Sequence, residues 1–185
     1  MIELQTERLL LRPWKPSDYK DLYEYAKSEK VGPNAGWRPH KDEEESKEII
    51  DLFLREDETW AIELLSKEKV IGSIGLHERT PDLSLVHLKQ KEIGYVLNPA
   101  YWGNGYVPEA VNAVLQFGFE ELSLDMVWCG HFDFNHNSKR VNKKCGFTYR
   151  FSEKKILERL DGKEVMSLYY SILREEYEGR MQQVK

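Results

Sequence analysis

The stretch NPAYWGNGYVPEA, residues 98–110, joins an alternating apolar run, KEIGYVLN, to a long helical pattern. Its two glycines, Gly103 and Gly105, remove side chains where backbone N–H groups can face a ligand, and the helix that follows adds the positive end of its dipole. Pro108 is tolerated in the first helical turn, where its missing N–H has no partner to lose. We therefore expect an anion to bind at this strand-to-helix turn.

Two other interpretations of the turn have to be weighed. A Gly-x-Gly sequence before a helix is more often plain turn chemistry than a phosphate site. A dinucleotide fold would need a third glycine three residues after Gly105, but position 108 is proline, and the turn follows an antiparallel segment rather than the first strand. We therefore exclude the dinucleotide fold and keep plain turn chemistry beside the anion site.

The composition is that of a globular protein. Of 185 residues, 41% are hydrophobic, and 27 basic against 32 acidic residues give a net charge of −5. Without a Lys/Arg-rich run, nucleic-acid binding is not expected. No apolar stretch is long enough for a membrane span, the N-terminus does not resemble a secretory signal, and two cysteines are too few for a disulfide framework. We predict one cytoplasmic domain over residues 1–185.

The order of predicted elements indicates an α/β fold with a mixed sheet. A first strand at 7–13 precedes a helix from Pro16 to near Glu29, a Gly/Pro loop at 31–40, and a helix that Asp42 and Glu45 cap. Strands at 59–66, 69–78 and 91–98 form an antiparallel part of the sheet. Helices after residue 105 and at 135–146 then alternate with strands at 125–132 and after Phe147. Asp161 and Gly162 predict a two-residue hairpin turn before a polar C-terminal tail.

Two longer segments carry a family resemblance. KEIGYVLNPAYWGNGYVPEAVNAVLQFGFEEL (91–122) followed by DFNHNSKRVNKKCGF (133–147) resembles the GNAT superfamily of acetyl-CoA-dependent N-acetyltransferases. Within it, the chain is most similar to the ribosomal-protein-alanine acetyltransferase type, because TERLLLRPWKPSDY (6–19) and GWRPHKDEEES (36–46) look like that type's opening segments. The resemblance implies a GNAT fold: a mostly antiparallel central sheet with a splayed strand pair and helices on both faces.

The resemblance also implies a coenzyme site. The amides of residues 103–107 would bind the coenzyme A pyrophosphate, and the strand that ends at Val96 and Leu97 would pair with the pantetheine arm. Asn135 and Ser138 match the family's Asn-x-x-Ser pattern, which contacts the coenzyme arm and the thioester. The predicted coenzyme residues are Val96, Leu97, Gly103, Asn104, Gly105, Tyr106, Val107, Asn135 and Ser138.

Acetyl transfer to an amine needs a base for the amine, a donor to the developing oxyanion and a proton for the departing sulfur. Glu92 is the base candidate, since its strand position faces opposite Ile93, and the type's EIGY context carries a proposed base; the alternative is an ordinary polar residue on a solvated strand face. Ser138 either donates to the sulfur or caps its helix. The N–H of Val96 or Leu97 is the natural oxyanion donor.

The sequence departs from the family at two positions. Ala100 stands where many members have Gln or Arg, and Asn142 stands where many place a tyrosine as general acid. An asparagine cannot protonate a thiolate, so the acid must come from another residue or from water. A covalent route through Cys129 or Cys145 is disfavoured, because one lies in an alternating strand and the other at a helix end, where the dipole opposes thiolate formation.

Trp37, Arg38 and His40 lie in the Gly/Pro loop that borders the acceptor entrance in the family, so they either contact the substrate or hold the loop on the core. His131 and His136, without paired carboxylates, are expected to be structural, and no metal is expected. The acceptor is a ribosomal-protein N-terminal Ala or Ser, a small amine or an aminoglycoside-like compound.

The sequence thus predicts an enzyme that transfers acetyl from acetyl-CoA to a primary amine in a ternary complex, as a monomer or a homodimer. A catalytically silent acyl-CoA-binding or sensing module is the alternative from another class, and a purely structural interaction domain is a third.

Overall fold

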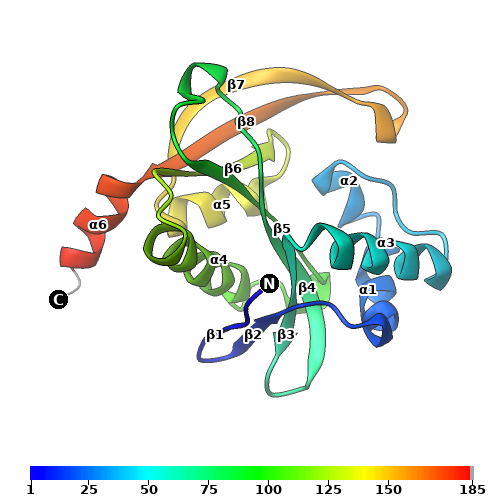
Figure 1. Cartoon of the computed structure of the whole chain (residues 1–185). Helices are drawn as coiled ribbons and strands as arrows, with labels where there is room; N and C mark the ends of the chain where they lie inside the picture. The colour runs from blue at the N-terminus through cyan, green and yellow to red at the C-terminus, as the bar shows by residue number, and fades with distance from the viewer. Residues whose placement is uncertain (184–185) are drawn as a thin grey trace.

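A computed structural model describes residues 1–183. Its core is one eight-stranded sheet with the strand order β1-β2-β3-β4-β5-β6-β8-β7 (Figure 1). Every neighbouring pair is antiparallel except β5 and β6, which are parallel. The strands are β1 Leu4–Gln5, β2 Leu9–Arg12, β3 Thr59–Leu64, β4 Lys69–His77, β5 Gln90–Leu97, β6 Met126–Phe132, β7 Thr148–Leu157 and β8 Lys163–Leu173. The predicted mixed, mostly antiparallel sheet is confirmed.

Helices cover both faces of the sheet, as predicted (Figure 1). One face packs against α4, whose buried stripe of Val107, Ala110, Val111 and Val114 joins the largest apolar cluster. The other face packs against α1 and α3, where Leu22, Tyr25 and Ile50 are buried. The helices are α1 Tyr19–Ala26, α2 Gly32–Ala35, α3 Glu43–Glu56, α4 Tyr106–Gln116, α5 His136–Cys145 and α6 Arg174–Gln183.

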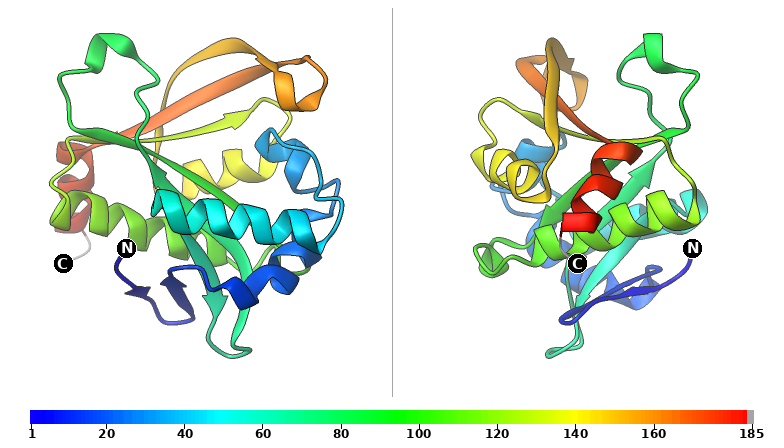
Figure 2. Two further views of the ribbon diagram at one scale, coloured as in Figure 1. Left: turned by 45° about the vertical axis from the view of Figure 1, so that its right-hand side comes forward. Right: turned by 90° about the vertical axis from the view of Figure 1, so that its left-hand side faces the viewer.

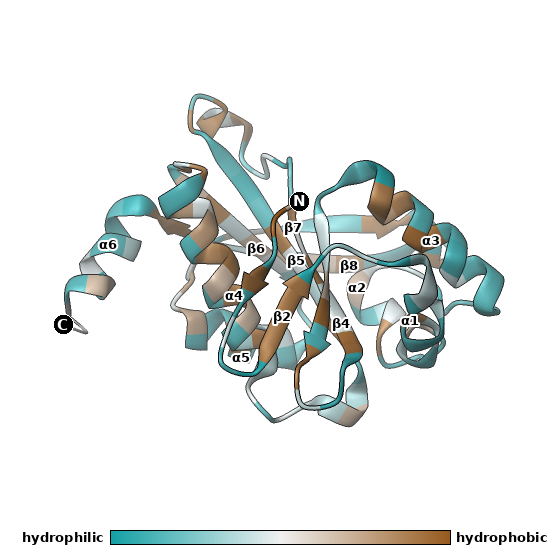
Figure 3. Cartoon of the chain, turned by 60° about the horizontal axis from the view of Figure 1, so that its bottom comes forward, coloured by the Kyte–Doolittle hydropathy of each residue, from teal (hydrophilic) through white to brown (hydrophobic). Residues whose placement is uncertain are grey.

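The distribution of apolar residues explains this layering. Figure 3 shows hydrophobic residues gathered in the strands and on α4, whereas α6 is largely hydrophilic. In α3, Asp42 caps the first turn by accepting a 2.9 Å hydrogen bond from the Glu45 N–H, as the sequence predicts. The helix buries little except Ile50 and Ser46, so it covers the sheet with one narrow face.

The parallel pair β5 and β6 separates soon after it begins. Only three residues of β5, Gln90 to Glu92, pair with β6, at Met126 to Trp128. Beyond Glu92, β5 continues to Leu97 along β4, while β6 continues to Phe132 along β8. The sheet is therefore split between its two middle strands, and the predicted splayed pair is confirmed.

Four local predictions are corrected. A short strand, β1, precedes the predicted first strand, and the Gly/Pro loop at 31–40 contains the one-turn helix α2, which ends because Gly36 adopts the left-handed region at φ 89°. The expected two-residue turn at Asp161 and Gly162 is a five-residue connection, because a 3₁₀ turn at Glu158–Leu160 precedes it. Both residues nevertheless have the positive φ angles that the hairpin prediction required.

The predicted polar tail is the helix α6. Its first turn is held by Glu176, which accepts a 2.8 Å hydrogen bond from the Leu173 N–H and pairs with Arg150. Arg180 of α6 donates to the carbonyl oxygens of Cys145 and Gly146 at the end of α5. Tyr177 is the apolar contact of α6, since its ring stacks on that of Phe119 with the centres 4.7 Å apart. Because charged side chains make much of the docking, the apolar periodicity on which the sequence prediction relied is missing.

The β7–β8 hairpin extends beyond the rest of the sheet and arches toward α2 (Figure 2). At its tip, Arg38 donates to the Asp161 carboxylate and to the Arg159 carbonyl oxygen. Gly36 lies against Phe132 and Leu157, where a side chain would contact the Phe132 ring at 3.3 Å. The loop after α2 is thereby fastened to the hairpin.

Candidate active site

The turn before α4 has the geometry that its glycines suggest. Gly103 and Gly105 have φ angles of 82° and 80°, in the left-handed region that other residues rarely adopt, and Gly105 is the N-cap of α4. Among residues 1–183, no N–H of residues 103–107 donates a hydrogen bond to another group of the chain. The turn therefore offers a row of unpaired donors at the positive end of a helix dipole.

A clasp of charged side chains holds this turn from outside. Arg8 donates to the Asn104 carbonyl oxygen at 3.0 Å and to the Glu109 carboxylate at 2.7 Å, and its guanidinium lies 4.6 Å from the centre of the Tyr106 ring. Glu109 also accepts from the Thr6 hydroxyl at 2.5 Å. Burial alone would raise the pKa of Glu109, but these hydrogen bonds outweigh it and lower the pKa. The carboxylate thus stays charged and fixes the turn.

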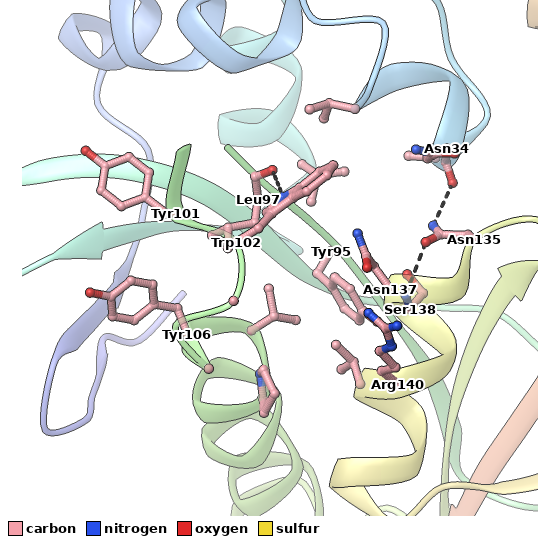
Figure 4. Close-up of a pocket in the computed structure, with 18 of the residues that line it drawn as sticks. Asn34, Tyr95, Leu97, Tyr101, Trp102, Tyr106, Asn135, Asn137, Ser138 and Arg140 are labelled. Atoms are coloured by element: carbon pink, nitrogen blue, oxygen red, sulfur yellow. Dashed lines mark hydrogen bonds between the residues drawn. The ribbon is translucent and has the colours of Figure 1, made fainter. Parts of the chain in front are cut away.

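A cavity of about 260 Å³ opens between the turn, the free end of β5, α5 and α2 (Figure 4). Eight of the nine predicted coenzyme residues line it: Val96, Leu97, Gly103, Gly105, Tyr106, Val107, Asn135 and Ser138. The ninth, Asn104, points elsewhere, since its side-chain amide donates to the Tyr101 and Trp102 carbonyl oxygens at 3.1 and 3.2 Å. On β5 the lining begins at Tyr95, three residues beyond the last pair with β6, so the unpaired end of β5 forms one of the cavity's walls.

The first turn of α5 closes another wall. Asn135, not Ser138, is the cap of this helix: its Oδ1 accepts a 3.1 Å hydrogen bond from the Ser138 N–H. The Asn135 Nδ2 donates to the Asn34 carbonyl oxygen of α2 at 3.3 Å, which ties the two helices together at the cavity (Figure 4). The capping role considered for Ser138 is therefore wrong, and its hydroxyl is left for the cavity.

Three cations line the same cavity. Lys30 precedes α2, whereas Arg140 and Lys144 lie one turn apart on α5. None of the three has a carboxylate within 4.0 Å in the described chain. Sequence analysis missed them, although the four-residue spacing of Arg140 and Lys144 predicts a common helix face. The cavity thus presents positive charge in addition to the amides of the turn.

The register of β5 decides which of its peptide groups face the split. The Leu76 N–H of β4 points toward β3, since it donates to the Glu58 carbonyl oxygen at 2.9 Å. The Asn98 N–H, just after β5, points toward β4, since it donates to the Ile71 carbonyl oxygen at 2.7 Å. Since hydrogen-bonded and non-hydrogen-bonded pairs alternate in an antiparallel ladder, Val96 bonds to β4 and Leu97 faces away from it. The Leu97 carbonyl oxygen accepts from the Trp102 indole at 2.9 Å (Figure 4).

Glu92 lies outside this cavity, at the point where the strands separate. It is the last residue of β5 that pairs with β6, and its carboxylate lies on the face opposite Ile93, over Gly130. The Glu92 side chain is 12% exposed, and its Oε2 is 3.5 Å from the Arg79 guanidinium. The carboxylate is thus largely shielded from solvent with one weak partner, not on a solvated strand face.

Comparison with known proteins assigns the family. The profile of an acetyltransferase (GNAT) domain matches residues 8–148. The chain belongs to the GNAT acetyltransferase family. It is 29% identical to "Uncharacterized N-acetyltransferase YnaD" of Bacillus subtilis (strain 168) over 95% of this chain and 99% of YnaD. The structure of a GNAT-family acetyltransferase from Bacillus anthracis superposes with a TM-score of 0.83 at 26% identity, over 95% of this chain and all of that one.

A second solved structure shares the fold at lower identity. The ribosomal-protein-S5-alanine acetyltransferase from Vibrio fischeri superposes with a TM-score of 0.70 at 18% identity, over 95% of this chain and 98% of that one. Members of the GNAT family use acetyl-CoA and an amine acceptor. No helix among residues 1–183 is long and apolar enough to cross a membrane.

In this GNAT acetyltransferase, the three predicted acceptor residues do not converge on one point. Trp37 is half-buried and packs beside His40 with the ring centres 5.3 Å apart. His40 is buried, its Nδ1 is 2.8 Å from the Ser46 hydroxyl, and burial lowers its pKa. Arg38 is exposed and pairs with Asp161 at the tip of the hairpin. The loop is therefore held both to the core and to the hairpin.

The cysteines have the environment of structural residues. Cys129 and Cys145 are both buried, and burial raises the pKa of Cys129 well above its usual value and that of Cys145 to about 11. A thiolate is therefore disfavoured at both positions. His131 is also buried beside the Tyr170 ring, and burial lowers its pKa. Asn142 is fully buried and donates to the Cys129 carbonyl oxygen at 3.3 Å.

Proposed function

We propose that this protein transfers the acetyl group of acetyl-CoA to a primary amine by direct attack in a ternary complex. The observation that carries the proposal is the cavity beside the unpaired end of β5, where free amides of the glycine turn meet three cations that have no carboxylate within 4.0 Å among residues 1–183. Phosphate oxygens bind at helix N-termini whose amides are free, and cations without carboxylate partners complement their charge. Both features fit an elongated anionic coenzyme.

The proposed binding mode assigns a part to each wall. The amides of residues 103–107 hold the pyrophosphate, and Lys30, Arg140 and Lys144 hold the remaining phosphate charge. The free edge of β5 pairs with the pantetheine arm, as an added strand pairs with a sheet. Asn135 and Ser138 contact the arm from α5. The coenzyme supplies the activated thioester, and the protein supplies position and charge.

For the oxyanion of acetyl transfer we propose the N–H of Leu97 rather than that of Val96. The alternation of the β5 ladder directs the Leu97 peptide away from β4, whereas the Val96 peptide bonds to β4. A preorganised N–H in a site with little water stabilises developing negative charge strongly. The Trp102 indole, which bonds to the Leu97 carbonyl oxygen, has to move when the pantetheine arm takes that position.

Glu92 is the proposed base, and it would act through a chain of water molecules, because five residues of extended strand, about 16 Å, separate it from Leu97. Its position at the end of the β5–β6 pairing places the carboxylate beside the opening and on the face away from α4 and α5. The amine would therefore approach from the face that bears Glu92, between the hairpin and the loop of Trp37, Arg38 and His40.

The sequence motifs suggest which classes of amine to test as acetyl acceptors. Similarity to the ribosomal-protein-alanine type favours a protein N-terminal Ala or Ser amine, and small amines and aminoglycoside-like compounds complete the panel. A panel of Ala- and Ser-initiated peptides, diamines and an aminoglycoside separates these classes. Release of the free coenzyme thiol reports turnover with each.

The first experiment is a thermal-shift titration with acetyl-CoA, using adenosine and NAD as controls. At about 100 times the Kd, binding adds roughly 2.7 kcal/mol to the free energy of unfolding, which raises Tm by about 5–10 °C. No shift with acetyl-CoA would contradict the proposed coenzyme site. A shift without turnover across the whole panel would favour the silent binding module instead.

The second experiment replaces the proposed base. Glu92→Gln should lower kcat by ~10²-fold or more, as loss of a general base does, and should flatten the rise of the rate with pH. Glu78→Gln is the matched control, since Glu78 is exposed and, in the described part of the chain, pairs with Lys91 alone. A Glu92→Gln enzyme with the wild-type pH profile would exclude Glu92 as the base.

A further inference from the structure

The glycine turn is fastened to the N-terminal segment by Thr6, Arg8 and Glu109, which together we call the clasp. Glu109, in the first turn of α4, accepts from the Thr6 hydroxyl at 2.5 Å and from the Arg8 backbone N–H at 3.0 Å. Its other carboxylate oxygen accepts from the Arg8 guanidinium at 2.7 Å. Thr6, Arg8 and Glu109 lie outside the cavity lining. The clasp therefore holds the turn from behind the surface that a ligand would meet.

One hydrogen bond of the clasp fixes the orientation of a peptide group in the turn. Arg8 donates to the Asn104 carbonyl oxygen at 3.0 Å. The peptide bond between Asn104 and Gly105 is trans and planar, so its N–H points opposite to its carbonyl. Because the carbonyl faces Arg8, the Gly105 N–H faces away from Arg8, and Gly105 lines the cavity. The guanidinium thus sets the direction of one of the free amides.

The same guanidinium also contacts the residues on either side of that N–H. It lies 4.6 Å from the centre of the Tyr106 ring, and its Nη2 is 3.6 Å from the position that a Gly105 side chain would take. Glycines at positive φ leave a free chain many conformations. The contacts of Arg8 restrict the turn to one of them before any ligand arrives.

Charge alone does not explain Glu109. Burial would raise its pKa, but the hydrogen bonds of the clasp lower it, so the carboxylate is charged. A negative charge close to the turn repels an anionic ligand. The carboxylate would therefore weaken coenzyme binding unless its hold on Arg8 contributes more than the repulsion removes.

We infer that Arg8 and Glu109 are positioning residues for the pyrophosphate of acetyl-CoA, which act by orienting the peptide between Asn104 and Gly105. The inference rests on the proposed use of acetyl-CoA. A turn that is ordered in the free protein loses little conformational entropy when the phosphates bind. Coenzyme affinity is thereby set in part by a segment about a hundred residues away in the sequence.

The coupling has to be reciprocal. If the clasp strengthens coenzyme binding, bound coenzyme strengthens the clasp by the same factor. Two backbone amides report on the clasp, because the Arg8 N–H donates to Glu109 and the Leu9 N–H donates to the Thr6 hydroxyl at 3.0 Å. Saturating acetyl-CoA should therefore slow hydrogen exchange at these two amides in the wild-type protein.

Glu109→Gln is the deciding variant, because positioning and charge predict opposite signs. The new amide group directs N–H donors at Arg8, so the guanidinium is released while the length of the side chain is kept. Positioning predicts a Kd and a KM for acetyl-CoA about 10-fold higher, with kcat at saturating acetyl-CoA unchanged. Removal of a negative charge near an anion predicts tighter binding instead. Calorimetric titration and steady-state kinetics measure these quantities.

Two milder or complementary variants accompany it. Arg8→Met should weaken binding as much as Glu109→Gln does, and the double variant should be no weaker than either single one, because the two residues act as a unit. Thr6→Val removes one hydrogen bond of the clasp and keeps the ion pair, so it should raise Kd only ~2-fold.

Asp21→Asn is the matched control. Asp21 of α1 accepts from the Lys69 ammonium group at 2.8 Å and from the Val70 N–H at 3.0 Å, so it combines a cation and a distant backbone N–H as Glu109 does. It lies outside the cavity lining. The variant should lower Tm to an extent similar to Glu109→Gln and leave both Kd and KM unchanged.

Three results would overturn the inference. The first is unchanged or tighter acetyl-CoA binding in Glu109→Gln, and the second is equal weakening in Asp21→Asn, which would reduce the clasp to a general contribution to stability. The third is hydrogen exchange at Arg8 and Leu9 that acetyl-CoA does not alter. Wild-type protein that binds acetyl-CoA but turns over no acceptor would overturn the acetyl transfer and leave this inference to be decided by Kd. Wild-type protein that does not bind acetyl-CoA would overturn both.

Discussion

Two polar regions of the molecule differ in how completely their groups are paired. Beneath α1, the Arg12 guanidinium is bonded to Asp18 at 2.8 and 3.0 Å and to Glu63 at 2.5 Å, and Asp18 also accepts from the Lys15 N–H. Burial alone would lower the pKa of Arg12, but its two carboxylate partners outweigh it and raise the pKa. This cluster, which we call the Arg12 cluster, has its charges matched.

The cavity between β5 and α5 is the opposite case. Within residues 1–183, its cations have no carboxylate within 4.0 Å, the amides of its glycine turn donate to nothing, and the buried Tyr95 hydroxyl makes no hydrogen bond of standard geometry. Buried polar groups are normally paired, because an unpaired one costs free energy. The contrast teaches that the Arg12 cluster stabilises the fold, whereas the cavity keeps its bonding capacity for a ligand.

The largest effect is expected from breaking the paired region. Asp18→Asn removes the main partner of a buried guanidinium, which should lower the free energy of unfolding by about 3 kcal/mol, at the lower end for such losses because Glu63 remains. Tm should fall by about 6–12 °C.

The control for this change is Asp161→Asn, the same substitution in an exposed ion pair with Arg38. It should cost ~1 kcal/mol or less. Equal losses in the two variants, measured by thermal and urea unfolding, would show that the Arg12 cluster has no special weight. The acetyl-CoA thermal shift should survive in both.

The next effect is expected from filling the unpaired region. Gly105→Arg introduces a long side chain at the glycine turn and should abolish the acetyl-CoA thermal shift, a loss of about 2.7 kcal/mol at 100 times the Kd. The positive φ at this position also strains a non-glycine residue by roughly 1–2 kcal/mol.

Gly162→Arg isolates that strain, because Gly162 has a φ of 71° at the hairpin tip, and a side chain there meets nothing within 4 Å. It should lower Tm and keep the response to acetyl-CoA. Retained binding in Gly105→Arg would contradict the placement of the pyrophosphate.

The smallest effect is expected from removing one cation of the cavity, which tests whether that cation binds the coenzyme. Lys144→Gln should weaken acetyl-CoA binding by ~2–5-fold, the range of one exposed charge pair, and the loss should shrink at high salt. Calorimetric titration at two salt concentrations measures both. Lys143→Gln, on the same helix but outside the cavity, should leave Kd unchanged. Equal weakening in both variants would mean that only the net charge of α5 matters.

Sequence reasoning predicted the local features of the site well. The alternation of β5 predicted the face of Glu92, and the glycines and Pro108 predicted the turn before α4. The sequence prediction failed for elements that are held in place by individual side-chain contacts rather than by a local apolar pattern. The α6 helix is held by Glu176, Arg180 and a single aromatic contact of Tyr177, and α2 is a single turn inside a Gly/Pro stretch, so neither has a periodic apolar signal.

The remaining gaps concern which groups are paired. Nothing in the local sequence says that Arg8 fixes the turn through Asn104 and Glu109, or that Asn34 meets Asn135, because about a hundred residues separate these partners. For the same reason, the sequence does not reveal that Arg140, Lys144 and the Tyr95 hydroxyl lack standard partners among residues 1–183. A side chain's chemistry is local, whereas its hydrogen-bond partners are set by the fold.

The sequence by itself determined the strand, the glycine turn and the helix of residues 91–116, because strand alternation, left-handed glycine and helix capping act within a few residues. Only the tertiary structure decided that this turn lines a cavity. Pairing of β5 with β6 stops at Glu92, and these strands meet only after the α4 crossover has brought distant segments together. The opening thus depends on where a long-range pairing ends.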